Sequence, residues 1–216
     1  MENLNKYIEH TLLKQDASVK DFEKLFAEAK EHKFLGVCVN PARVKLAAET
    51  LKGTDVKIVT VVGFPLGASI PEAKAFEAEQ AIKDGADEID MVINVGLIKD
   101  KNFEAVQHDI EVVKKSCKDK KLKVILETDL LTKEEIKQAC EICVKAKADL
   151  VKTSTGFVKG GVGAKVEDVE IMYNTVSSHG LEVKASGGIK DKQKALDLIK
   201  AGATRLGTSS GVAIIS

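Results

Sequence analysis

Tryptophan is absent from this 216-residue sequence, and aromatic residues make up only 4% of it. So few aromatic side chains argue against a surface on which nucleic-acid bases stack. The formal net charge is zero, from 33 basic and 33 acidic residues. No overall basic field therefore draws the chain toward nucleic acid or an anionic membrane, and we expect no nucleic-acid partner.

Long apolar runs are missing as well. No stretch approaches the roughly 20 residues that a membrane span needs, and the polar N-terminus, Met-Glu-Asn-Leu-Asn-Lys, does not resemble a signal peptide. We therefore expect a cytoplasmic protein with no membrane partner. In a reducing compartment the four cysteines are predicted to be free thiols: Cys38, Cys117, Cys140 and Cys143.

Metal-ligand patterns are scarce. Cys140 and Cys143 have the spacing of half a zinc or redox site, but they fall within a predicted helix, Lys133–Lys147. No second Cys/His pair stands at zinc-ligand spacing, and the four histidines are scattered. We predict ordinary helix cysteines, no metal and no cofactor.

Short β-branched strands alternate with amphipathic helices along the whole sequence. The predicted strands are Tyr7–Thr11, Leu35–Asn40, Lys57–Val62, Glu88–Ile93, Lys123–Glu127, Leu150–Thr153, Glu182–Ala185 and Arg205–Gly207. Eight strand–helix units predict an all-parallel sheet, and eight strands favour a closed (β/α)8 TIM barrel over an open doubly wound sheet. With no linker or composition break, residues 1–216 are predicted to form a single barrel domain.

Functional residues of such a barrel lie where strands end and the following loops begin. Three charged residues interrupt apolar strands, namely Asp90, Lys152 and Lys184. Alternation along the fourth strand sets Asp90 opposite Ile89 and Met91, which places it in the barrel interior. In a desolvated cavity a neighbouring ammonium would pull the pKa of one lysine toward neutrality, as Schiff-base chemistry requires. A carboxylate nearby can then move protons.

Two interpretations of these residues stay open at this point. Lysine is so common in this sequence that one strand-end lysine carries little weight, although two are harder to dismiss. The other interpretation is a buried Lys–Asp–Lys salt-bridge cluster that links three strands and performs no chemistry.

Glycine and serine follow the last strands, where barrels frequently bind phosphate through backbone N–H groups. The residues predicted to bind substrate and its phosphate here are Thr155, Gly156, Gly187, Gly188, Gly207, Ser209 and Ser210. Cys38 stands at a strand end near the predicted mouth with no partner base, so we favour a packing or wall role for it.

Five motifs together resemble the deoxyribose-phosphate aldolase family, in order and over essentially the whole chain. They are Ile8-Glu9-His10-Thr11-Leu12-Leu13, Glu88-Ile89-Asp90-Met91-Val92-Ile93-Asn94, Val151-Lys152-Thr153-Ser154-Thr155-Gly156-Phe157, Val183-Lys184-Ala185-Ser186-Gly187-Gly188-Ile189 and Arg205-Leu206-Gly207-Thr208-Ser209-Ser210-Gly211. The resemblance implies a class I, metal-independent aldolase. Such an enzyme reversibly cleaves 2-deoxy-D-ribose 5-phosphate to glyceraldehyde 3-phosphate and acetaldehyde.

The resemblance also implies roles for single residues. Lys152 would form the Schiff base, Lys184 would lower the pKa of Lys152 and exchange protons, and Asp90 would donate and accept protons. Glu9 would contact Lys184, and it replaces the aspartate usual in the family. Lys190 stands where arginine is common, which keeps a charge but weakens bidentate phosphate recognition.

Expected partners are phosphosugar and aldehyde substrates and further copies of the chain, as a homo-dimer or homo-tetramer. A transaldolase-like Schiff-base enzyme is one alternative. A phosphosugar isomerase or synthase with Asp90 as base and electrostatic lysines is a second, and a non-enzymatic binding module is a third. The sequence stops at Ser216, whereas many family members extend to a tyrosine that reaches the site.

Overall fold

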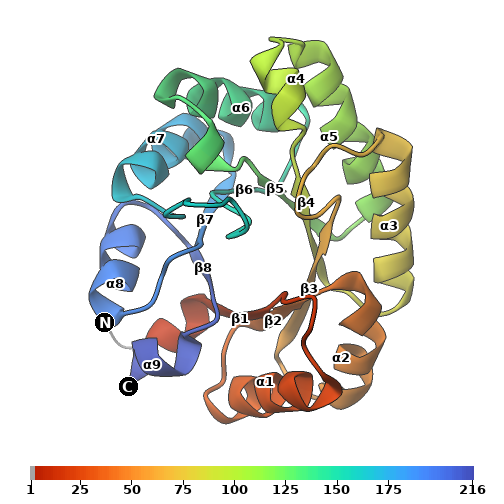
Figure 1. Ribbon diagram of the computed structural model, residues 1–216, viewed down its shortest axis with the longest axis vertical. Coiled ribbons are helices and arrows are strands. Elements are labelled where there is room, and N and C mark those ends of the chain that lie inside the picture. The colour runs from red at the N-terminus through yellow and green to blue at the C-terminus, as the bar shows by residue number, and fades with distance from the viewer. Residues whose placement is uncertain (1–2) are drawn as a thin grey trace.

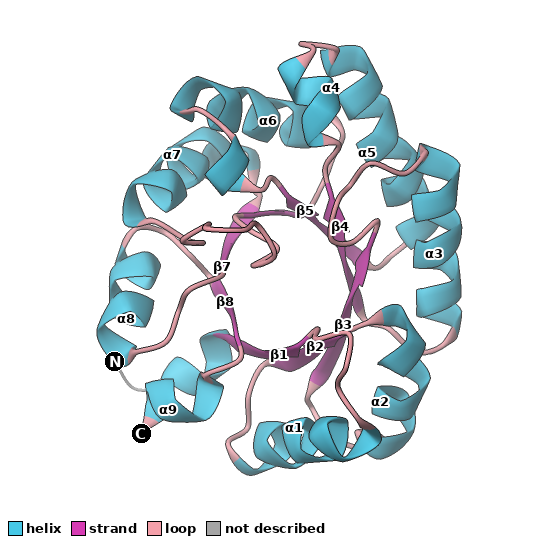
Figure 2. Cartoon of the chain, viewed as in Figure 1, coloured by secondary structure: helices cyan, strands magenta, loops and turns pink. Residues whose placement is uncertain are grey.

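Eight parallel strands close into a barrel in the computed structural model, which describes residues 3–216 (Figure 1). Each strand pairs with the next in sequence order, and β8 pairs with β1 to complete the ring. Helices surround the ring on its outer side (Figure 2). The predicted (β/α)8 barrel is therefore confirmed.

The strands are β1 (Ile8–Leu12), β2 (Gly36–Val39), β3 (Lys57–Val62), β4 (Glu88–Val92), β5 (Lys121–Ile125), β6 (Leu150–Lys152), β7 (Glu182–Ser186) and β8 (Arg205–Thr208). The α-helices are α1 (Val19–Glu31), α2 (Val44–Thr50), α3 (Pro71–Lys83), α4 (Val95–Lys99), α5 (Phe103–Cys117), α6 (Lys133–Lys145), α7 (Val166–Val176), α8 (Lys192–Lys200) and α9 (Gly211–Ile215). Short 3-10 turns precede β1 and follow β2, β5 and α7.

Two helices were not predicted and one strand is displaced by two residues, while the bounds of the other seven strands agree with the prediction within one residue. The five-residue helices α4 and α9 follow β4 and β8 and were not predicted, because one turn is too short to show helical periodicity. β5 runs from Lys121 to Ile125 and not over Lys123–Glu127. It ends early because Glu127 adopts a left-handed backbone conformation, φ 60°, which a strand does not allow.

The hydrophobic core is a layer between the strands and the surrounding helices. Phe22 and Phe26 of α1, together with Val106 and Ile110 of α5, are at most 1% exposed within it. Inside the barrel the packing is divided. Cys38, Val59 and Val61 of β2 and β3 form a small apolar cluster with Leu13, whereas the other strands contribute charged side chains to the interior. The charged side chains available for a functional site therefore lie on the strands other than β2 and β3.

All four cysteines are buried and free, as predicted: Cys38, Cys117, Cys140 and Cys143. Burial raises the pKa of the Cys117 thiol to about 12 and also raises the pKa of Cys140 and Cys143. These thiols therefore stay protonated and unreactive at neutral pH. No helix within residues 3–216 is long and apolar enough to cross a membrane.

A buried ion pair joins α3 to α5 outside the barrel wall. The Lys74 Nζ lies 2.6 Å from Asp109 Oδ2 and donates a second hydrogen bond of 3.0 Å to the Val92 carbonyl at the end of β4. Desolvation lowers the pKa of Lys74 and raises the pKa of Asp109. The pair thus fastens two helices to the strand that carries Asp90.

Substitution Lys74→Met is expected to lower the free energy of unfolding by about 3–5 kcal/mol, because Asp109 would remain buried without its counter-charge. Urea denaturation followed by circular dichroism measures the loss. Lys99→Met is the matched control, since its partner Glu135 and Lys99 itself are partly exposed, and it should cost less than about 1 kcal/mol. Equal losses of unfolding free energy in the two variants would contradict a special contribution of the Lys74–Asp109 pair to stability.

Candidate active site

Asp90 on β4 accepts hydrogen bonds from three lysines inside the barrel. Its Oδ2 lies 2.8 Å from Lys152 Nζ and 2.7 Å from Lys184 Nζ, and its Oδ1 lies 2.9 Å from Lys123 Nζ. All four side chains are buried, with at most 4% exposed. One carboxylate therefore holds three lysine side chains from three other strands.

Strand register explains why these residues meet. In the parallel pairing, Lys152 of β6 stands beside Lys184 of β7, and Asp90 of β4 stands beside Lys123 of β5. Residues two apart on a strand share a face, so Glu88 also points inward with Asp90. Together with Glu9 of β1, the charged residues line the interior from β4 through β8 to β1, opposite the apolar cluster of β2 and β3.

Three members of this network escaped the sequence analysis: Glu88, Lys123 and Arg205. Lys123 Nζ lies 2.7 Å from Glu88 Oε2, and Arg205 lies 3.4 Å from both Glu88 and Glu9. Glu9 also accepts a hydrogen bond from Lys184. The sequence does contain a signal for Lys123, because it alternates with Leu122 and Val124 as Asp90 alternates with Ile89 and Met91. The predicted strand Lys123–Glu127 begins at this residue, however, and a charge at a strand start does not interrupt an apolar run.

The electrostatics fix the ionisation of the central groups. Burial opposes the charged form of Asp90, but Lys123, Lys152 and Lys184 outweigh it and hold the pKa of Asp90 well below its usual range. Burial likewise opposes the ammonium of Lys184, but Asp90 and Glu9 raise the pKa of Lys184 above its ordinary value. At neutral pH the site therefore contains a permanent carboxylate beside a permanent ammonium.

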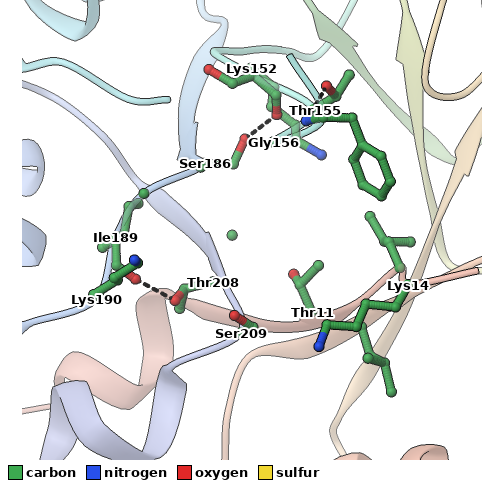
Figure 3. A pocket seen from close by; sticks show the side chains of 17 residues that line it. Thr11, Lys14, Lys152, Thr155, Gly156, Ser186, Ile189, Lys190, Thr208 and Ser209 are labelled. Carbon is green, nitrogen blue, oxygen red and sulfur yellow. Dashed lines mark hydrogen bonds between the residues drawn. The ribbon is translucent and has the colours of Figure 1, made fainter. Parts of the chain in front are cut away.

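A cavity of about 320 Å³ opens above Lys152, at the ends of the strands (Figure 3). Lys152, Thr155 and Gly156 border one side of it, while Thr11 and Lys14 border another. Three lysines line the cavity, Lys14, Lys152 and Lys190, and no carboxylate does. Such a lining favours an anionic ligand.

Gly187 and Gly188 shape the rim between β7 and α8. Both have positive φ angles, 87° and 66°, which glycine adopts without strain. A Cβ on Gly188 would lie 2.3 Å from the Val162 carbonyl oxygen, and one on Gly163 would lie 2.3 Å from the Gly187 backbone. The loop after β6 therefore packs directly on the backbone of the loop after β7.

Hydrogen bonds join the remaining loops into one frame. Glu127 accepts from the Thr155 backbone N–H at 3.0 Å and from the Thr155 hydroxyl. Ser186 Oγ donates to the Ser154 carbonyl at 2.6 Å, which links the ends of β6 and β7. Thr208 Oγ1 donates to the Ile189 carbonyl at 2.7 Å and joins β8 to that frame.

The structure places the sequence-predicted residues at two levels. Those that line the cavity are Lys152, Thr155, Gly156, Gly187, Gly188, Gly207 and Ser209. Those that lie beneath it or beside it are Glu9, Cys38, Asp90, Lys184 and Ser210. Burial raises the pKa of the Cys38 thiol, and Cys38 packs against Val59 and Val61, which fits a wall residue. Thr11, Ser154, Ser186 and Thr208 also line the cavity; they stand in the family motifs, but the sequence analysis assigns them no binding role.

Metal ligands do not gather in the part of the chain that the structure describes. Within residues 3–216 no group of three or more His, Cys, Asp or Glu side chains is arranged to hold a metal ion. Metal independence stays a prediction, and the chemistry available from the described residues is that of amines, carboxylates and hydroxyls.

A family model and two curated relatives match nearly the whole chain. Residues 5–216 match the DeoC/LacD family aldolase model. The chain is 57% identical over 212 residues to a deoxyribose-phosphate aldolase of Streptococcus gordonii, covering 98% of this chain and 95% of that protein. It is 56% identical over 214 residues to the deoxyribose-phosphate aldolase of Brevibacillus brevis, covering 99% of this chain and 96% of that protein.

A solved structure agrees. The tetrameric deoxyribose phosphate aldolase from Aeropyrum pernix superposes with a TM-score of 0.91 at 32% identity, covering 98% of this chain and 89% of that one. Matches of this extent cover the barrel, the buried network and the cavity rim together. The chain therefore belongs to the DeoC/LacD family of aldolases.

Proposed function

We propose that this protein is a class I deoxyribose-phosphate aldolase, which reversibly cleaves 2-deoxy-D-ribose 5-phosphate to D-glyceraldehyde 3-phosphate and acetaldehyde through a Schiff base on Lys152. The observation that carries the proposal is the position of Lys152, whose Nζ shares one oxygen of Asp90 with Lys184 beneath a cavity lined by cations. The names of close relatives support the same substrate.

Schiff-base formation uses Lys152 as a neutral amine. Its nitrogen attacks C1 of the open-chain sugar aldehyde, and water leaves as protons move from the nitrogen to the departing oxygen. Lys184, an ammonium at neutral pH, disfavours a second ammonium on Lys152. Asp90 contacts both nitrogens and accepts or delivers these protons, directly or through water.

Cleavage then breaks the bond between C2 and C3. The C3 hydroxyl loses its proton, its oxygen forms the new aldehyde of glyceraldehyde 3-phosphate, and the bonding electrons pass to the iminium as an enamine. Protonation of the enamine carbon and hydrolysis of the imine release acetaldehyde and restore the amine. Every proton taken from a hydroxyl is returned to carbon or water, so no metal or redox group is needed.

The phosphate is assigned to the rim formed by Gly187, Gly188, Ser209 and Ser210, with Lys190 supplying charge. Four of these five residues line the cavity, and Ser210 stands next to it with its backbone N–H donating to Thr208 at 2.9 Å. Backbone N–H groups, hydroxyls and one lysine together suit a phosphate dianion. In the proposed binding mode the phosphate lies at one end of the cavity and C1 lies over Lys152.

The assembly and location of the protein belong to the same proposal. We infer a homo-oligomer, a dimer or a tetramer, which the tetrameric relative from Aeropyrum pernix supports. A phosphosugar substrate is retained inside cells by its charge, so we place the protein in the cytoplasm.

Trapping tests the Schiff base directly. Acetaldehyde followed by borohydride should add one ethyl group at Lys152, and peptide mass spectrometry identifies the modified residue. EDTA should leave the labelling unchanged, because no step uses a metal. Labelling of another lysine, or of none, would contradict the mechanism.

Substitution Lys152→Arg separates an aldolase from the isomerase or synthase alternative. Arginine keeps the positive charge but stays protonated, so an aldolase should lose activity by about 10⁴-fold or more, since its covalent path is gone. An enzyme that uses Asp90 as base and Lys152 only as a charge would keep most of its turnover of phosphosugars. Kinetics with deoxyribose phosphate and with ketose phosphates distinguish the two outcomes.

Substitution Gly188→Ala tests the phosphate rim. The new methyl group would meet the Val162 carbonyl at 2.3 Å, so the rim must shift and KM for the phosphorylated substrate should rise about tenfold or more, roughly 1.4 kcal/mol. Gly180→Ala is the matched control, because Gly180 also has positive φ, 81°, but nothing lies within 4 Å of its Cβ position. Equal KM values for both variants would remove Gly188 from the phosphate site.

A further inference from the structure

Seven charged side chains form one continuous network inside the barrel, each at most 9% exposed and each within 4.0 Å of an oppositely charged partner. They are Glu9, Glu88, Asp90, Lys123, Lys152, Lys184 and Arg205. Three are acidic and four are basic. With Lys152 as an ammonium the network carries one excess positive charge, and with Lys152 as an amine it is neutral.

The reaction as described uses Asp90, Lys152 and Lys184, and among the remaining members only Lys123 contacts Asp90 directly. Its side chain is fully buried and does not line the cavity, so it cannot touch substrate. Its Nζ lies 2.9 Å from Asp90 Oδ1, 2.7 Å from Glu88 Oε2 and 3.6 Å from Glu9 Oε1. It therefore occupies the Asp90 oxygen that faces away from Lys152 and Lys184.

This geometry has two consequences. The bond to Oδ1 fixes the rotation of the Asp90 carboxylate, so that Oδ2 is presented to Lys152 and Lys184 together. The Lys123 ammonium also neutralises part of the negative charge that Asp90 presents to Lys152. Asp90 alone would favour protonation of Lys152, and Lys123 offsets that preference.

We propose that Lys123 is a positioning residue of the aldolase reaction, which orients Asp90 and completes the charge balance that leaves Lys152 as a free amine. The inference rests on the proposed function, because it assumes that Lys152 is the Schiff-base lysine. Glu88 has the opposite effect, since its carboxylate neutralises part of the Lys123 charge at 2.7 Å.

Other titratable groups face the network and have to be considered. Cys38 of β2 keeps its proton, and Glu127 beyond β5 is hydrogen-bonded to Thr155 and forms no ion pair among the described residues. Lys57 and Glu182 approach the network from its solvent side, at 3.9 Å from Glu88 and 3.8 Å from Arg205. β3 contributes Val59 and Val61. These groups are unchanged in every variant tested below, so they do not alter the direction in which a variant displaces the pH profile.

The test compares Lys123→Met, Glu88→Gln and the double variant. Activity requires the Lys152 amine, so kcat/KM rises with pH as Lys152 loses its proton. In Lys123→Met the network is neutral with Lys152 protonated, so this rise should move to higher pH by about one unit or more, with about tenfold lower kcat/KM at pH 7. In Glu88→Gln the rise should move to lower pH. The double variant should return close to the parent profile, because both charges are removed together.

Two readouts are used, the pH profile of kcat/KM and the pH profile of borohydride trapping with acetaldehyde. Lys74→Met is the control, a buried lysine outside the barrel that should lose stability without moving either profile. Losses of rate in all three test variants with no displacement of the pH profiles would overturn the inference and leave Lys123 a structural residue. If Lys123→Met does not fold, the absence of an acid shift in Glu88→Gln overturns it equally.

The inference and the proposed function fail differently. Parent protein that traps no acetaldehyde at Lys152 refutes the proposed function whatever the variants do. Parent protein that is labelled at Lys152, with unshifted variant profiles, keeps the aldolase and refutes only the role of Lys123.

Discussion

The carboxylate of Asp90, shared by three lysines inside a closed barrel, is the interaction on which the site depends. A buried carboxylate normally loses its charge, because desolvation disfavours the ionised form. Here Lys123, Lys152 and Lys184 approach within 2.9 Å and hold the pKa of Asp90 well below its usual range. The same ionisation keeps the lysines in place, so the carboxylate and the three amino groups orient one another.

A network of this kind contributes little to stability, since desolvation of buried ions offsets most of their attraction. The fold must therefore be stabilised elsewhere, and the apolar layer between strands and helices is where this occurs. Phe22, Phe26 and the apolar faces of α3, α5 and α6 belong to that continuous layer. The apolar layer stabilises the fold, so most of the barrel interior is left for the charged network. This explains the divided interior, in which β2 and β3 pack apolar side chains and the remaining strands hold charges.

Much of the fold follows from sequence patterns, because strand–helix alternation and helix caps are local signals. Ser18 and Thr132 begin their helices with capping boxes, as their sequence contexts indicate. The exceptions are elements with weak local signals. α4 and α9 are single turns, and β5 is displaced because Glu127 turns into a left-handed conformation to reach Thr155, a tertiary contact that no local pattern contains.

The candidate site was only partly predictable for a related reason. Asp90, Lys152 and Lys184 were identified because they interrupt apolar strands, and the family motifs reinforce them. Arg205 begins β8, and Lys123 begins the predicted strand Lys123–Glu127, a position where a charge usually reaches solvent. In the structure β5 starts at Lys121, which places Lys123 in its middle, level with Asp90. Only the closed ring and its register reveal that these side chains turn inward and meet Glu88 and Glu9.

Closure of the barrel therefore brings charged residues from separate strands into a single buried network. In an open sheet β1 and β8 would be edges, and Glu9 could not contact both Lys184 and Arg205. Closure brings Glu9 against β7 and β8, encloses seven charges and removes the water that would screen them. The electrostatic environment of Lys152 is then the sum of those charges and not the effect of any single neighbour. Under the proposed function, the Schiff-base lysine would consequently be tuned by residues such as Lys123 that do not line the cavity.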